Sequence, residues 1–145
     1  MRISMIKEAK TKTVVDTLKG LGAFTILVKC LRATGLITML GNPKLVFTIF
    51  APNDRAFKQL VPQGQLRALL KDKARLQQVI RYHLVTERIE LRHTDNRVPV
   101  RTMEGSTVLL QEGGSFLVNN ARVLRPDMEC MNGMIHEIDA VLLPK

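Results

Sequence analysis

A single stretch, Thr48-Ile49-Phe50-Ala51-Pro52-Asn53-Asp54-Arg55-Ala56-Phe57, places polar residues among apolar ones. The residues that lead into it, Leu45 to Phe50, are rich in β-branched and aromatic side chains, which is typical of a short buried strand. Pro52 cannot continue a central strand. Asn53 or Asp54 can cap a helix that begins there. The stretch therefore predicts a corner at which a buried strand turns into a helix.

Apolar residues recur at helical spacing on both sides of this corner. Phe24, Leu27, Val28 and Leu31 fall at i, i+3, i+4 and i+7, and Gly35 is the expected stop signal. Further helices are predicted over residues 13–18, 36–40 and 65–83, the last as two helices or one bent helix.

The second half of the chain changes to the period of strands. We expect strands at Val108 to Gln111, Phe116 to Val118, Arg122 to Leu124 and Ile135 to Leu142, separated by hairpin turns. The highly charged residues 86–97 are predicted to form a surface loop. Helices in the first half and antiparallel strands in the second favour an α+β fold with a mostly antiparallel sheet.

The overall composition fits one domain. The chain has 145 residues, of which 46% are hydrophobic, so it can bury a sizeable core. We expect a poorly ordered basic lead-in at 1–12 and a single domain at 13–145. The net charge of +9 can serve simply to keep the protein soluble. It also attracts polyanions, which include nucleic acid, anionic glycans and anionic membranes.

Cysteine usage and hydropathy narrow the class of protein. Cys30 and Cys130 form no CxxC pair, which excludes a disulfide-dense scaffold and a Cys-rich zinc site. One bridge is possible, but two buried free thiols fit better. No apolar run is long enough for a signal peptide or a membrane span. The protein is therefore expected to stay inside the cell, unless an export signal has been removed.

Two histidines lie in apolar surroundings. His83 follows Leu76, Val79 and Ile80 at helical spacing, and His136 lies in an apolar strand. A buried neutral imidazole needs partners for both ring nitrogens, and an unpaired buried polar group costs about 1–3 kcal/mol. We therefore expect a structural hydrogen-bond network. The expected partners of His83 are Thr48, Asn53, Asp54 or the backbone.

A catalytic reading of the same histidines is weaker. His83 or His136 could act as a base oriented by Asp54 or Asp139, but no Ser or Cys has the context of a nucleophile. A metal site built from these histidines and His93 lacks the i, i+4 pair of a zinc-binding helix. We predict that the chain is not an enzyme and holds no cofactor and no metal.

Five segments resemble the fasciclin domain family, in the family's order. Thr48 to Phe57 is similar to its first signature, and Asn132-Gly133-Met134-Ile135-His136-Glu137-Ile138-Asp139-Ala140-Val141-Leu142-Leu143-Pro144 is similar to its second. Tyr82-His83 stands where the family has its Tyr-His pair. Arg101 to Gly105 and Val118 to Val123 match two shorter elements. The resemblance extends over roughly residues 13–144.

The resemblance implies a fold and a set of structural residues. The fold is a wedge-shaped β-sandwich, mostly antiparallel, with helices from the N-terminal half packed on one side. The polar positions of the signatures are expected to cluster for folding. The signature residues are Thr48, Phe50, Pro52, Asn53, Asp54, Phe57, Tyr82, His83, Asn132, Gly133, Ile135, His136, Ile138 and Asp139.

The resemblance also implies a non-catalytic adhesion module, extracellular or at the cell surface, that binds proteins or envelope or matrix components. An alternative is a carrier of a small apolar ligand such as a carotenoid, in a groove between helices and sheet. Polyanion binding is a third possibility, with Arg88, Arg92, Arg97 and Arg101 as the expected anion-facing patch. Nucleic acid is disfavoured because the basic residues are not interleaved with aromatics.

Overall fold

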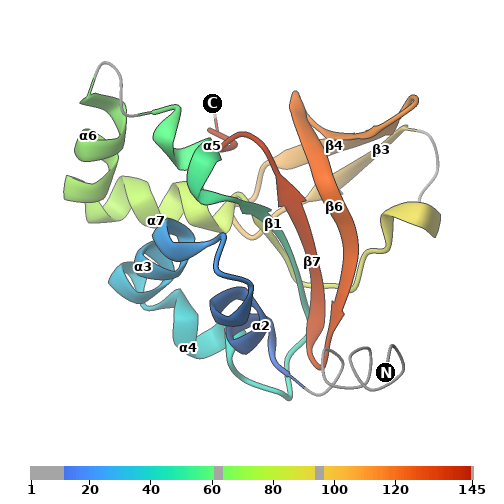
Figure 1. Ribbon diagram of the computed structural model, residues 1–145, viewed down its shortest axis with the longest axis horizontal. Coiled ribbons are helices and arrows are strands. Elements are labelled where there is room, and N and C mark those ends of the chain that lie inside the picture. Colours follow the sequence, from blue (N-terminus) through green and yellow to red (C-terminus); the bar gives the residue numbers. More distant parts are fainter. Residues whose placement is uncertain (1–11, 61–63, 94–96, 145) are drawn as a thin grey trace.

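The computed structural model describes residues 12–60, 64–93 and 97–144. The predicted lead-in lies outside these residues, apart from Lys12. Helices from the first half of the chain gather on one side of a long, bent sheet (Figure 1). This arrangement confirms the predicted α+β fold.

The helices begin and end where local capping predicts. Thr13 accepts a hydrogen bond from the backbone of Asp16 at the start of one helix, and Gly35 ends another in the left-handed conformation. Asp72 caps the last helix, so the predicted helical region 65–83 is two helices. The helices are α2 (Val14–Leu21), α3 (Thr25–Thr34), α4 (Leu36–Leu40), α5 (Asp54–Lys58), α6 (Gln65–Lys71) and α7 (Lys73–Arg81), with a short 3-10 turn, η2 (Leu91–His93).

Seven strands form one continuous sheet in the order β2-β1-β7-β6-β5-β4-β3. All neighbours are antiparallel except β1 and β7, which run parallel and bring the two signatures side by side. The strands are β1 (Phe47–Pro52), β2 (Leu84–Val85), β3 (Arg97–Arg101), β4 (Thr107–Glu112), β5 (Phe116–Val118), β6 (Ala121–Cys130) and β7 (Gly133–Ile138).

Strand β1 begins and ends two residues later than the predicted strand at 45–50. Leu45 and Val46 are 41% and 44% exposed and precede the strand. Pro52 does belong to a central strand, where it lies opposite Ile138. The strand tolerates this proline because it is the last residue of β1, so its missing N–H interrupts no later pairing. Asn53 caps α5 as expected, accepting a hydrogen bond of 2.8 Å from the backbone of Ala56.

The second half contains a strand that the sequence pattern did not predict. In β3 the side chain of Val100 is buried while Arg97, Pro99 and Arg101 are exposed, and the proline hides the alternation. The strand predicted at 122–124 extends as β6 to residue 130, with irregular pairing at 123–128. The strand predicted at 135–142 ends already at residue 138.

Two apolar cores lie on opposite faces of β1. Phe47, Ile49 and Ala51 join the core beneath the helices. Phe50 points the other way and packs in a second core with residues of β3 and β4 such as Val100. The sheet therefore folds over itself as a sandwich, while the helices cover its outer side.

Candidate functional site

The start of the second signature ties the helices to the sheet. The side-chain oxygen of Asn132 accepts from the backbone N–H of Val14 at 2.8 Å, and its amide donates to the carbonyl of Leu40 at 2.8 Å. Asn132 therefore satisfies the beginning of α2 and the end of α4 together. A Cβ on the next residue, Gly133, would lie 1.9 Å from the carbonyl oxygen of Phe47. The motif is a close-packed junction of the fold.

Asn53 and Asp54, in the first signature, make further long-range bonds. The amide of Asn53 donates to the carboxylate of Glu137 at 2.8 Å, and that buried carboxylate also pairs with Arg125. The Asp54 carboxylate accepts from the backbone N–H of Ile26 at 2.7 Å and so satisfies the start of α3. These groups are occupied by structural bonds.

Thr48 and His136 fix the charged loop that follows β2. The Thr48 hydroxyl donates to the carbonyl of Glu87 at 2.6 Å and accepts from the N–H of Ile89 at 2.9 Å. His136 Nδ1 accepts from the N–H of Asp127 at 2.9 Å, and its Nε2 lies 2.8 Å from the carbonyl of Ile89. Burial lowers the pKa of His136, so the neutral ring donates from Nε2 and accepts at Nδ1.

His83 finds only backbone partners, and the predicted side-chain partners are not used. Its Nδ1 lies 2.7 Å from the carbonyl of Val79, and its Nε2 accepts from the N–H of Leu142 at 2.9 Å. The ring is completely buried, and burial lowers its pKa to about 4. A neutral imidazole with both nitrogens bonded has no free site for proton transfer, so it serves as a clamp on the segment after β7.

The cysteines are also inert. Cys30 and Cys130 are free and buried, which matches the expectation of two apolar thiols. Burial raises the pKa of Cys30 to about 11, and burial likewise raises the pKa of Cys130. Among residues 12–60, 64–93 and 97–144, no group of three or more His, Cys, Asp or Glu could hold a metal ion.

The four arginines proposed as an anion-facing patch have different surroundings. Arg88 donates to the carbonyl of Gly133 at 3.2 Å, and Arg92 lies 3.4 Å from Glu90. Arg97 and Arg101 are exposed at the two ends of β3, on one face of that strand. The latter two are thus the members of the set that present a common surface.

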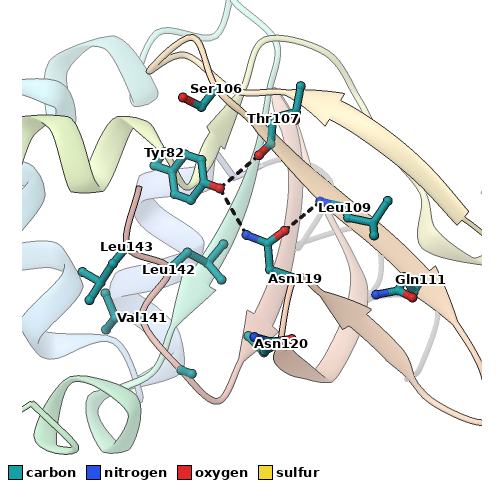
Figure 2. A pocket seen from close by; sticks show the side chains of 12 residues that line it. Tyr82, Ser106, Thr107, Leu109, Gln111, Asn119, Asn120, Val141, Leu142 and Leu143 are labelled. Carbon is teal, nitrogen blue, oxygen red and sulfur yellow. Dashed lines mark hydrogen bonds between the residues drawn. The ribbon is translucent and has the colours of Figure 1, made fainter. Parts of the chain in front are cut away.

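Next to that face of the sheet lies a groove of about 680 Å³ (Figure 2). Tyr82 and Asn119 build its wall. The Tyr82 hydroxyl donates to the carbonyl of Thr107 at 3.0 Å and accepts from the Asn119 amide at 3.1 Å. The Asn119 oxygen accepts from the N–H of Leu109 at 2.8 Å, which fixes the β5–β6 turn against β4. The Tyr of the Tyr-His pair therefore organises a surface groove, while the His is fully buried.

Other groups that line the groove have no structural task. Gln111 and Asn120 carry amides for which the described residues provide no side-chain partner. Leu143, 48% exposed, and the half-buried Leu109 add apolar surface. Cross-strand pairing places Arg97 opposite Gln111 at the edge of the sheet. A hollow that combines apolar contact with free hydrogen-bonding groups is suited to binding.

The alternative of an apolar-ligand carrier requires a groove between the helices and the sheet. The space between helices and sheet is filled by fully buried side chains such as Leu27, Ile49 and Ile80. An apolar cleft does open between α2 and α3, but it holds about 200 Å³. This volume is below the range of about 300–1,000 Å³ that is typical of small-molecule sites.

Comparisons with known proteins agree with this architecture. Residues 22–144 match the Fasciclin domain family. The chain belongs to the fasciclin family. Its domain is 36% identical over 120 residues to protein sll1735 of Synechocystis, covering 83% of this chain and 89% of that protein. It is 32% identical to pig transforming growth factor-beta-induced protein ig-h3, covering 91% of this chain and 19% of that protein.

The fold of this fasciclin domain is also found among solved structures. The structure of a FAS1 domain pair from the insect cell adhesion molecule Fasciclin I superposes with a TM-score of 0.79 at 22% identity, covering 93% of this chain and 52% of that chain. Fasciclin domains are non-catalytic binding modules, so the prediction that the chain is not an enzyme is confirmed. None of the helices in the described part of the chain has the length and apolar character of a membrane span.

Sequence reasoning identified the interior of this fasciclin domain better than its surface. Tyr82 was singled out by its place in the family, but its role in the groove wall was not foreseen. Gln111 lies in no motif, whereas Asn120 and Leu143 lie in segments that resemble the family but were not predicted to line a groove; the three come from separate segments. The one available signal was the Asn119-Asn120 turn, because a left-handed Asn119 (φ 52°) is what such a turn requires.

Proposed function

We propose that this domain is an adhesion module that binds a protein, or an envelope or matrix component, at the cell surface through the groove beside Tyr82. Membership of the fasciclin family supports an interaction module, and one relative of the same fold is described as an insect cell adhesion molecule. The observation that carries the proposal is the groove, whose apolar and amide groups are left free by the fold.

The chemistry of the groove favours a partner with both apolar and hydrogen-bonding groups. Leu109 and Leu143 offer apolar contact, while Gln111 and Asn120 can each donate and accept. An extended peptide or a sugar chain has this mixed character. Arg97, at the adjacent edge, adds a positive charge that an anionic glycan would neutralise.

The proposal is tested by binding of the labelled domain to the envelope fraction of the source cells. Leu143→Asp introduces a charge into the groove and is expected to weaken binding by roughly tenfold, since it removes an apolar contact and buries an unpaired carboxylate. Leu124→Asp is the matched control, because Leu124 is 47% exposed, as against 48% for Leu143, and does not line the groove.

Two results would count against this function. If Leu143→Asp and Leu124→Asp bind as well as the unchanged domain, the groove is not the binding surface. If antibody against the domain fails to label intact cells but labels opened cells, the proposed location at the cell surface is wrong.

A further inference from the structure

The net charge of the chain is concentrated in its helical half. Residues 12–85 contain twelve Lys or Arg against three Asp or Glu, whereas residues 86–145 contain seven against nine. The Arg–carboxylate pairs found between described residues all lie in the second half, for example Arg92 with Glu90 and Arg125 with Glu137. The helical half therefore carries the net positive charge that the whole chain shows.

The few carboxylates in the helical half are engaged locally. Asp54 accepts the backbone N–H of Ile26, and Asp72 accepts the backbone N–H of Arg75. Asp16 lies in the first turn of α2, where a negative charge complements the helix dipole. The cations of these helices are thus left without carboxylate partners among the described residues.

Four of these cations surround two neighbouring hollows on the helices. Lys19, Lys29 and Arg32 line the apolar cleft between α2 and α3. Arg32 also lines a second hollow of about 410 Å³, together with Lys73 at the start of α7. All four side chains are exposed. Figure 1 shows α2, α3 and α7 on one side of the molecule and β3 and β4 on the other.

This charge arrangement is unfavourable in the isolated domain. Lys29 and Arg32 are three residues apart on α3, where like charges repel. Lys73 is the first residue of α7, the end of a helix at which a cation is disfavoured by the dipole. An acidic partner would relieve both effects, so the arrangement has charge complementarity to a polyanionic surface.

The apolar cleft between α2 and α3 indicates that a partner also contributes an apolar group. Its walls are Leu18, Phe24 and Val28, which are 1%, 1% and 8% exposed, so they are recessed below the cations. Side chains that insert into a bilayer must protrude, and these do not. Stacking on nucleic acid bases needs exposed aromatic rings, and the aromatic residue here is buried. A volume of about 200 Å³ suits one apolar side chain from outside.

We propose that the surface formed by α2 and α3 is a docking site for an acidic protein segment that inserts one apolar side chain between the two helices. The carboxylates of the segment pair with Lys19, Lys29 and Arg32 around the cleft. Hydrophobic contact at the centre and charge at the rim are the usual arrangement of a protein interface. This site is separate from the groove beside Tyr82 and does not depend on it.

The test uses a fluorescent peptide of alternating aspartate and glutamate around one central phenylalanine, with anisotropy as the readout. A second peptide has alanine in place of the phenylalanine and is expected to bind roughly tenfold more weakly. The triple change Lys19→Glu, Lys29→Glu and Arg32→Glu should weaken binding of the first peptide by roughly tenfold or more.

Two further variants separate this site from general attraction to a basic protein. The triple change Lys44→Glu, Arg55→Glu and Lys58→Glu alters the net charge equally at exposed positions that do not line the cleft, and it should weaken binding by less than about threefold. Thr25→Trp covers the cleft from an exposed position without changing the charge, and it should abolish the preference for phenylalanine over alanine.

The proposal is overturned if both triple variants weaken binding equally, or if the two peptides bind equally well. It is also overturned if vesicles of phosphatidylglycerol and phosphatidylcholine, or a single-stranded DNA, retain the protein while the acidic peptide does not. A Leu143→Asp domain should bind the peptide normally, so failure of this site and failure of the groove give different results.

Discussion

The buried histidine of the Tyr-His pair makes the stability of the domain sensitive to acid. In the folded state the pKa of His83 is about 4, compared with the ordinary value of 6.5. The unfolded chain therefore takes up a proton between these two pH values while the folded chain does not. The contribution of the neutral ring to stability is complete above pH 6.5 and is lost as the pH falls toward 4.

The size of the effect follows from the same two values. Each pH unit between them costs about 1.36 kcal/mol in the free energy of unfolding. Lowering the pH from 7 to 4 should thus remove about 3 kcal/mol through His83, a large part of the roughly 5–15 kcal/mol typical of a domain. Burial lowers the pKa of His136 as well, so this second ring adds to the loss in the same direction.

The assay is urea unfolding at intervals between pH 7 and pH 4, for the unchanged protein and for His83→Gln. Glutamine can still accept from the N–H of Leu142 but takes up no proton. The variant should be less stable at pH 7 by about 1–3 kcal/mol, because the bond to the carbonyl of Val79 is lost. The difference between the two proteins should then shrink as the pH falls.

A control separates titration from simple destabilisation. Ile80→Val removes a buried methylene from the same helix and should cost about 0.5–1.5 kcal/mol at every pH. The reasoning fails if His83→Gln and the unchanged protein lose stability in parallel between pH 6.5 and pH 4. An NMR titration in which the His83 ring takes up its proton near the ordinary pKa would refute it directly.

Three further outcomes follow from the buried contacts. Gly133→Ala should destabilise the domain by about 3 kcal/mol or more in urea unfolding, because the new methyl group meets the carbonyl of Phe47, whereas Gly113→Ala, in open space, should change little. Thr48→Val should cost about 2 kcal/mol and speed hydrogen exchange at the N–H of Ile89, the group that its hydroxyl accepts from. The Cys30 thiol should react with a thiol reagent at pH 8 only after unfolding, since its pKa is about 11; prompt reaction of the folded protein would contradict its burial.

Features set by local chemistry could be predicted from the sequence. The apolar spacing from Phe24 to Leu31 and the stop at Gly35 predict α3 because both depend on residues within one helix. Asn53 predicts the start of α5 for the same reason. Features that depend on residues far apart in the sequence were harder to predict. Pro52 was judged incompatible with a central strand, yet the parallel pairing with β7 accommodates it at the strand end.

The same distinction applies to the candidate sites. Periodicity indicated that His83 is buried, but its partners are backbone groups, which have no sequence signature. The four arginines from Arg88 to Arg101 were predicted as an anion-facing patch because they lie in or beside the charged loop. The sequence alone could not show that Arg92 lies beside Glu90 while Arg97 and Arg101 share an exposed face of β3. The cleft flanked by Lys19 and Arg32 becomes visible only when two helices are packed together.

The position of β7 has a consequence for how the chain is made. This strand is synthesised last of the seven, yet it lies between β1 and β6, and its first residue pairs with Phe47, which left the ribosome long before. Until Gly133 to Ile138 emerge, one edge of β1 has no partner strand, and such edges are prone to pair with other chains. The nascent domain should therefore keep this edge of β1 open until the final strand is inserted.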